Sequence, residues 1–142
     1  MRIGHTGTRN APTSAQKSAV YDELLRTEQG WRGELGDLEF HHGDCVGTDA
    51  FAARVAYAFG YRVVAHPPSD PGLRSWTNAH ETRVPLPYIQ RNHVIVDEIE
   101  HLIVTPEGPE RLRSGTWATV RYARRLERPM TIVWPDGRVE SA

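Results

Sequence analysis

The sequence predicts an α/β protein built on an open, mostly parallel sheet with helices on both faces. Short apolar runs typical of buried strands alternate with stretches that carry apolar residues at helical spacing. This alternation favours parallel strands joined by right-handed helical crossovers. The chain has 142 residues, which is enough for one domain with its own core, and we expect a single domain over residues 1–142.

Five strands and four helices are expected in alternating order. The strands are short apolar runs, and they cover residues 1–4, 38–41, 62–66, 102–104 and 130–134. The first helix runs to about residue 29 from a capping box, Thr13–Gln16. Apolar residues at helical spacing, including Ile89, Val94 and Ile95, predict the others, which cover residues 49–59, 86–99 and 117–126. Gly60 is expected to end the second helix.

The segment 67–85 interrupts this pattern. It has no clear periodicity and is rich in Pro, Ser, Asp and Asn, and long loops in compact domains are usually functional or disordered. Arg74 and Trp76 are candidates for a lid that closes over a ligand, with Trp76 stacking on a base. The alternative is a mobile loop whose tryptophan packs on the surface.

Composition and charge narrow the classes of function. Hydrophobic residues make up 39% and charged residues 25% of the chain, as in ordinary globular proteins. The net charge of −1 gives no overall field to attract nucleic acid or an acidic membrane. Cys45 is the one cysteine, the opening residues resemble a strand rather than a leader, and no apolar run reaches about 20 residues. We therefore expect a cytoplasmic protein with no membrane partner, and a homo-oligomer stays open.

Three strand-to-helix junctions carry glycine, in residues 4–9, 43–49 and 113–116. In an open α/β sheet such turns gather at the carboxyl ends of the strands, where ligands bind. Ser114, Gly115 and Thr116 precede a helix, whose start offers free N–H groups and the positive end of the helix dipole. These residues predict a phosphate site, flanked by Arg111 and Arg113. The alternative is that Ser114 only caps the helix.

Asp44 and Asp49 lie around the second glycine turn. They are candidates to contact a ribose hydroxyl, to orient a water, or to hold a metal with His41 and His42. Asp49 is equally well placed to cap the following helix. We expect no metal site, because the two histidines form neither an i, i+4 pair nor part of a Cys/His quartet.

Five segments carry a resemblance to a known family. Ser114–Ala123 resembles the Ser-Gly-Ser-x-x-Thr-x-Arg-x-Ala motif of the DNA-processing protein A group, Gly7–Arg9 is similar to its Gly-Ser/Thr-Arg, and Gly43–Asp49 resembles its second glycine loop. Tyr88–Asn92 followed by His101–Pro106 is similar to the pattern of the Lonely-guy phosphoribohydrolases. Together they resemble the SLOG superfamily, and most of all the small stand-alone YspA-like proteins of bacteria and phages.

The resemblance implies a Rossmann-like fold that binds a nucleotide or nucleotide-derived ligand and requires no further cofactor. Its phosphate is expected at Ser114, Gly115 and Thr116. The resemblance and the glycine turns together assign the ligand to Gly7, Thr8, Arg9, Gly43, Asp44, Gly47, Thr48, Asp49, Arg91, Asn92, Pro106, Ser114, Gly115, Thr116 and Thr119.

The phosphoribohydrolases of this superfamily act with an arginine and a glutamate. Arg91 matches the arginine, but Thr119 stands where the glutamate is expected. We therefore expect a binding protein that acts as a sensor, carrier or sponge. The alternatives are a hydrolase of a nucleotide's glycosidic or phosphate bond, with Arg91, Asp44 and Asp49 as candidate catalytic residues, and a single-stranded DNA-binding protein. The last is disfavoured because the chain lacks net positive charge.

Overall fold

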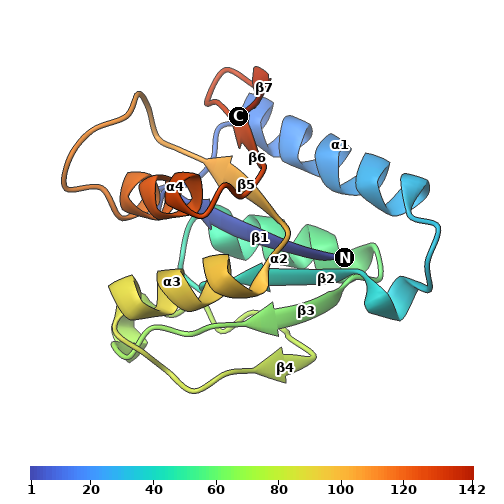
Figure 1. Cartoon of the computed structure of the whole chain (residues 1–142), viewed down its shortest axis with the longest axis horizontal. Helices are drawn as coiled ribbons and strands as arrows, with labels where there is room; N and C mark the ends of the chain where they lie inside the picture. The colour runs from blue at the N-terminus through green and yellow to red at the C-terminus, as the bar shows by residue number, and fades with distance from the viewer.

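The computed structural model describes residues 1–142, the side chain of Leu35 excepted. Seven strands form one sheet in the order β4-β3-β2-β1-β5-β6-β7 (Figure 1). All neighbouring strands are parallel except β6 and β7, which are antiparallel. The expected open, mostly parallel sheet is thus confirmed. The strands are β1 (Arg2–Gly7), β2 (Glu39–His42), β3 (Arg62–Ala65), β4 (Glu81–Thr82), β5 (His101–Thr105), β6 (Met130–Val133) and β7 (Val139–Ser141).

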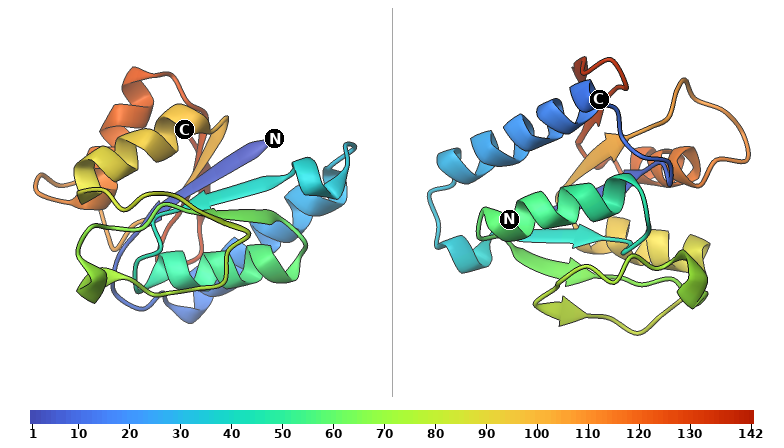
Figure 2. Two further views of the ribbon diagram at one scale, coloured as in Figure 1. Left: turned by 90° about the horizontal axis from the view of Figure 1, so that it is seen from below. Right: turned by 180° about the vertical axis from the view of Figure 1, so that it is seen from behind.

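Two helices cover each face of the sheet. The helices α1 (Ser14–Gly30) and α2 (Thr48–Ala58) pack together on one face, and α3 (Tyr88–Glu98) and α4 (Gly115–Arg125) on the other (Figures 1 and 2). Each face has its own buried core. The first contains Leu24, Phe40 and Tyr61, and the second contains Ile95 and Trp117. Short 3₁₀ helices occupy Leu35–Asp37 and Pro71–Leu73. None of the described helices is both long and apolar enough to cross a membrane.

The expected capping box forms only in part. Thr13 Oγ1 accepts a hydrogen bond from the Gln16 N–H at 3.0 Å, as a capping residue should. The Gln16 side chain does not return the bond. Its Nε2 donates instead to the carbonyl oxygens of Pro106 at 3.1 Å and Val133 at 2.9 Å. Gln16 therefore ties the start of α1 to the ends of β5 and β6.

Several local expectations differ from the structure. The two edge strands β4 and β7 were not expected, since each is only two or three residues long and exposed or half-buried. Ile89 is 55% exposed rather than packed, because α3 turns that face to solvent. The helix α2 begins at Thr48 with Gly47 as its N-cap residue, so Asp49 lies inside the first turn and does not cap it.

The topology leaves a crevice beside β1. The chain moves from β1 to β2, β3 and β4 on one side, and returns to β5 on the other side of β1. The turns that leave the carboxyl ends of β1 and β5 therefore run in opposite directions. Open α/β sheets bind their ligands in the crevice between two such turns. Gly7 and Thr105 pair at this end of the two strands.

Candidate ligand-binding cleft

A cleft of about 470 Å³ lies at this crevice. Its walls come from residues 5–10 at the end of β1 and just beyond it, and from Gly43, Cys45 and Asp49 between β2 and the first turn of α2. The start of α3, and residues between 107 and 117 in the loop before α4 and its first turn, complete them. All three glycine-bearing turns therefore border one cavity. The volume lies in the range of sites for small molecules and cofactors.

The start of α4 opens into the cleft. Ser114 Oγ accepts a hydrogen bond from the Trp117 N–H at 3.3 Å, and the Ser114 carbonyl accepts one from the Ala118 N–H at 2.8 Å. Gly115 and Thr116 also line the cleft, and their N–H groups belong to the first turn, where no helical carbonyl is in reach. A Cβ atom on Gly115 would meet only the Tyr88 ring, at 3.6 Å. This helix start is therefore accessible to an anion.

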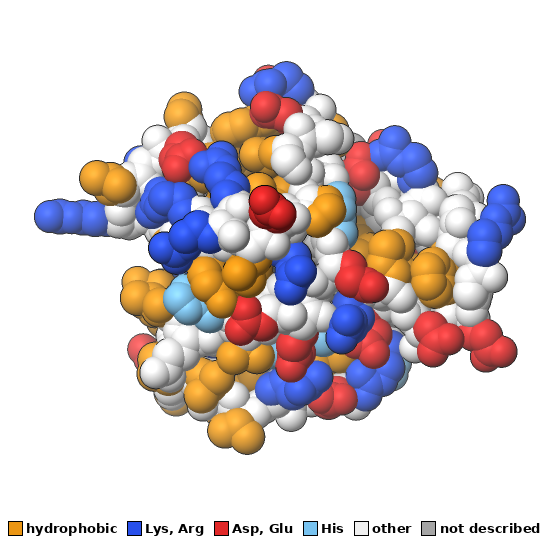
Figure 3. All heavy atoms as spheres, in the orientation of Figure 1, with side chains coloured by type: hydrophobic (Ala, Val, Ile, Leu, Met, Phe, Trp, Pro, Cys, Tyr) orange, Lys and Arg blue, Asp and Glu red, His pale blue; other side chains and the backbone are white. Residues whose placement is uncertain are grey.

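Positive side chains predominate around the opening. Arg9, Arg91, Arg111 and Arg113 line the cleft against the two carboxylates of Asp49 and Glu107. Figure 3 shows arginine side chains gathered over α4 and the loop that leads to it; the chain's one lysine, Lys17, lies in α1. A cavity whose lining charges are mostly positive raises the local concentration of anions.

Arg91 is fixed at the base of the cleft and is only 4% exposed. Its Nη1 donates to the carbonyl oxygens of Gly43 and His66, its Nε to Asn92 Oδ1 at 2.7 Å, and its Nη2 to Cys45 Sγ at 3.5 Å. One N–H of Nη2 is left over from the five that a guanidinium carries. A Cβ atom on Gly43 would lie 2.7 Å from Arg91 Cζ, so this position requires glycine.

Asp49 pairs with a histidine that sequence reasoning missed. Asp49 Oδ1 accepts a hydrogen bond from His5 Nδ1, and Oδ2 accepts one from the Gly43 N–H at 2.9 Å. Burial alone would raise the pKa of Asp49, but the hydrogen bond and charge of His5 and the nearby Arg91 lower it, so the carboxylate is ionised. His5 Nε2 shares a hydrogen bond of 2.9 Å with Thr105 Oγ1. The available signal was a histidine within the first glycine-bearing junction, residues 4–9.

Asp44 lies outside the cleft lining and holds the segment 67–85 in place. Its Oδ2 accepts from Arg74 Nε at 2.6 Å, and its Oδ1 accepts from Ser75 Oγ at 2.9 Å and from Thr77 N and Oγ1 at 3.2 and 2.9 Å. The Arg74 guanidinium stacks over the Trp76 ring at 3.7 Å, and Trp76 is 63% exposed. Neither residue lines the cleft, so the segment expected to act as a lid is anchored beside it.

Gly47 and Thr48 contact the backbone of Thr8 and Arg9 without lining the cleft themselves. The Thr48 N–H and Oγ1 both donate to the Thr8 carbonyl, at 3.1 and 3.0 Å. Gly47 has a φ of 94°, and a Cβ atom there would lie 2.5 Å from the Arg9 carbonyl carbon. These two residues therefore position Thr8 and Arg9, which do line the cleft.

Thr119 and Pro106 also lie away from the cleft lining. Thr119 Oγ1 donates to the Gly115 carbonyl at 2.9 Å within α4, and Pro106 is held by Gln16. The expected site residues that do line the cleft are Gly7, Thr8, Arg9, Gly43, Asp49, Arg91, Asn92, Ser114, Gly115 and Thr116. Lining residues that the sequence did not assign to the site are His5, Thr6, Asn10, Cys45, Tyr88, Glu107, Gly108, Pro109 and Trp117.

The Cys45 thiol is not activated as a nucleophile, and His41 and His42 do not form a metal site with Asp49. Burial and the Asp49 carboxylate raise the pKa of the Cys45 thiol, which disfavours the reactive thiolate. His41 and His42 alternate along β2, so they face opposite sides of the sheet and cannot share a metal with Asp49. Burial lowers the pKa of His42 to about 4, and its Nδ1 accepts from the Asp44 N–H at 3.0 Å.

Comparison with known proteins identifies the fold. No protein-family model and no curated protein matches the chain. Similar solved structures include the molybdenum cofactor binding protein of Rippkaea orientalis (TM-score 0.70, 19% identity, covering 94% of this chain and 76% of that one). The Moco carrier protein of Chlamydomonas reinhardtii has a TM-score of 0.65 at 19% identity, and the match covers 92% of this chain and 74% of that one. DNA processing protein A of Streptococcus pneumoniae has a TM-score of 0.69 at 19% identity, and the match covers 92% of this chain and 49% of that one. The chain thus shares the Rossmann-like fold that the SLOG resemblance implies.

Proposed function

We propose that the cleft binds a nucleotide or a nucleotide-derived phosphorylated ligand, and that the protein carries or senses this molecule. The observation that carries the proposal is the start of α4, which opens into a cleft lined by four arginines and two carboxylates. Free N–H groups, the helix dipole and surrounding cations together favour a phosphate at Gly115 and Thr116.

The rest of the ligand has partners in the same cleft. The Tyr88 ring lies beside Gly115 and below the Arg9 guanidinium, whose Cζ is 5.7 Å from the ring centroid. An aromatic ring that is 43% exposed at the cleft is a suitable surface for a planar base to stack on. Tyr88 therefore takes the stacking role that the sequence suggested for Trp76. Arg91 offers its remaining N–H from the base of the cleft.

Two of the similar structures are described as a binding protein and a carrier protein for the molybdenum cofactor. This supports binding and delivery as the activity of this fold here, and makes the molybdenum cofactor one candidate ligand. The free, buried thiol of Cys45 is consistent with action in a reducing cytoplasm.

The hydrolase alternative has little support from the described residues. Breaking a glycosidic bond needs a base for water and stabilisation of the charge that develops on the ribose. Thr119 is engaged within α4, and Asp44 is held by the segment 74–77. Asp49 lines the cleft, but both its oxygens already accept hydrogen bonds from the protein. Glu107, the other carboxylate of the cleft, accepts from Asn10 Nδ2 at 2.7 Å and pairs with Arg111, so a hydrolase would depend on one of these two engaged acids.

Mass spectrometry of small molecules released from denatured, freshly purified protein tests the proposal. We expect a phosphorylated molecule with the wild type and its loss with Gly115→Asp. Calorimetry with AMP, GMP, CMP, UMP and a single-stranded oligodeoxynucleotide extends the test. Tight binding of the oligonucleotide alone would favour the DNA-binding alternative. No released molecule and no binding of any nucleotide would count against the proposal.

Chromatography of the four nucleoside monophosphates after long incubation with micromolar protein tests hydrolysis. We expect no more than trace release of free base. Release over many turnovers that disappears in Asp49→Asn would establish a hydrolase instead of a binding protein.

A further inference from the structure

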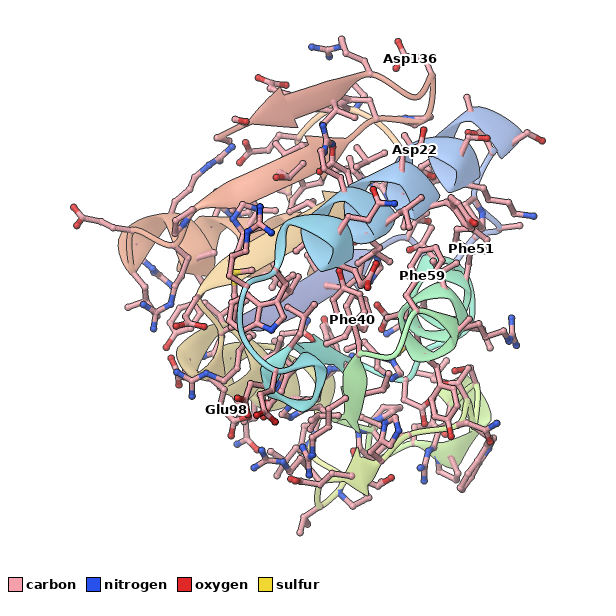
Figure 4. The ribbon with its side chains drawn as sticks, turned by 90° about the vertical axis from the view of Figure 1, so that its right-hand side faces the viewer. Asp22, Phe40, Phe51, Phe59, Glu98 and Asp136 are labelled. Atoms are coloured by element: carbon pink, nitrogen blue, oxygen red, sulfur yellow. The ribbon has the colours of Figure 1, made fainter. Side chains whose placement is uncertain are left out.

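Three atoms of metal-ligand type converge on the face of the sheet opposite α1 and α2. They are His41 Nδ1 from β2, His66 Nε2 just beyond β3, and Glu98 Oε2 from the last turn of α3. The two nitrogens lie 2.9 Å apart, and Glu98 Oε2 lies 3.4 Å from the first and 3.6 Å from the second. Figure 4 labels Glu98 beside α3. These residues come from three elements and belong to no part of the cleft lining.

The spacing fits a tetrahedral ion. Zinc binds histidine nitrogen and carboxylate oxygen at about 2.0–2.2 Å, so ligand atoms in a tetrahedral site lie about 3.3–3.5 Å apart. The three observed separations of 2.9, 3.4 and 3.6 Å surround these values. A point about 2 Å from all three atoms exists slightly out of their plane, where a tetrahedral site needs its ion. An ion therefore fits with only small side-chain adjustments.

The hydrogen bond to Glu39 puts His41 in the tautomer that suits a metal ligand. Glu39 Oε1 accepts a hydrogen bond from His41 Nε2 at 2.7 Å, which leaves the lone pair of His41 Nδ1 facing His66 and Glu98. A carboxylate behind a histidine is the usual outer partner of a metal ligand. With His41 Nδ1 as acceptor, the 2.9 Å contact is a hydrogen bond donated by His66 Nε2. An ion would replace this hydrogen bond, with the proton of His66 on its Nδ1 instead.

Glu98 Oε2 is the second, independent indication. This oxygen is buried and has no hydrogen-bond partner among the described residues, whereas Oε1 accepts from Arg83 Nη1 at 3.2 Å. Buried polar atoms are nearly always paired, and each exception calls for an explanation such as an ion. The Glu98 side chain as a whole is 27% exposed, so its buried Oε2 lies close to the surface.

The charges around the three ligands favour a cation. Glu39 and Glu81 stand on the same side as Glu98, against Arg62 and Arg83. Arg83 opposes a cation through its charge, but it binds Oε1 of Glu98 and leaves Oε2 without a hydrogen-bond partner.

We propose that His41, His66 and Glu98 form a binding site for Zn²⁺, with water in the fourth position. Two imidazole nitrogens and one carboxylate are an established ligand set for zinc, and the tetrahedral spacing favours it over an octahedral ion. The ion would join β2, the end of β3 and α3. It would also hold His66, whose carbonyl accepts from Arg91 Nη1 at 3.1 Å. The site stands whether or not the cleft binds a nucleotide.

Metal titration of the chelator-treated full chain tests the site. We expect one Co²⁺ per chain with the visible absorption of a four-coordinate ion, and displacement of Co²⁺ by Zn²⁺. Glu98→Gln and His41→Gln should each weaken Zn²⁺ binding in calorimetry by at least about tenfold. Zn²⁺ should raise the melting temperature of the wild type and leave that of Glu98→Gln unchanged.

Matched variants separate ligand loss from other effects. His93→Gln and Asp97→Asn remove a histidine and a carboxylate of α3 that lie outside the proposed site. His93 stacks on Tyr122, and Asp97 accepts a hydrogen bond from the Tyr122 hydroxyl. Both variants should bind Zn²⁺ as the wild type does. Arg83→Gln breaks the ion pair to Glu98 but keeps the ligands, and should bind equally or more tightly. The proposal is wrong if no ion binds at one per chain, or if Glu98→Gln keeps wild-type affinity. It is equally wrong if Arg83→Gln binds as weakly as Glu98→Gln. Because Glu98 is partly exposed, its variant decides the question even if His41→Gln does not fold.

Discussion

Replacement of Gly115 by aspartate should abolish ligand binding while the protein stays folded. A Cβ atom at Gly115 meets only the Tyr88 ring, at 3.6 Å, so the side chain enters the cleft rather than the core. An acidic residue in the first turn of a helix is stabilising by roughly 0.3–1 kcal/mol. The melting temperature of Gly115→Asp should therefore equal or exceed that of the wild type.

The loss of affinity follows from charge and space. Two unit charges 4 Å apart repel by about 4 kcal/mol at an effective dielectric constant of 20, and salt reduces this value. A hydrogen bond from an N–H to a charged oxygen is worth about 1.5–3 kcal/mol, and the new carboxylate takes the place of the phosphate. A loss of at least about 3 kcal/mol, or roughly a hundredfold in Kd, is the expected result.

Calorimetry with the molecule identified by mass spectrometry measures this loss. Gly115→Ala is the control for volume and should cost much less than Gly115→Asp. Gly108→Asp is the control for charge: a Cβ atom at Gly108 has open space around it, and Gly108 lines the cleft away from the helix start. Unchanged affinity in Gly115→Asp, with unchanged melting, would show that the phosphate does not bind at α4. An equal loss in Gly108→Asp would assign the effect to the overall charge of the cleft.

Three other outcomes are expected. Arg91→Ala should weaken ligand binding by about 1–3 kcal/mol through loss of a charge-assisted hydrogen bond, and Arg91→Lys should restore little of it in calorimetry because the forked donor is missing. Asp44→Ala should lower the free energy of unfolding, measured in urea, by about 3–5 kcal/mol, because it removes the buried carboxylate that pairs with Arg74. A change below about 1 kcal/mol would contradict the role of Asp44 in anchoring the segment 67–85. Asp49 has a pKa below its ordinary value of 3.8, so its ionised form stabilises the fold above that pH and the stability is lost as the pH falls through the lowered pKa. The difference in unfolding free energy between wild type and Asp49→Asn should therefore be largest near neutral pH and shrink below about pH 4; a difference independent of pH would refute the ionised carboxylate.

The glycine turns could be located from the sequence because a strand-to-helix junction is a local feature. Gly7, Gly43 and Gly115 each follow an apolar run and precede a helical pattern, and parallel topology brings such turns to one edge of the sheet. Arg91 was assigned to the site by the resemblance to the phosphoribohydrolases, and it lines the same cleft. The edge strands β4 and β7 could not be predicted, since two or three residues with exposed faces carry no measurable alternation.

Asp44 and Asp49 show where local reasoning ends. In the sequence they are equivalent acids around one turn. In the structure Asp44 binds the segment 74–77, while Asp49 binds His5 on β1. The difference arises because two elements far away in the chain pack on opposite sides of the turn. Only tertiary structure decides which acid reaches the cleft.

The sequence by itself determined the α/β class, the alternation of elements and the position of the anion-favouring helix start at Ser114–Thr116, because each depends on neighbouring residues. The tertiary structure alone decided what lies together across the sheet. It brought the Tyr88 ring against Gly115, turned Trp76 away from the cleft, and gathered His41, His66 and Glu98 from three elements. Such contacts depend on strand order and helix packing, which no local pattern of residues specifies.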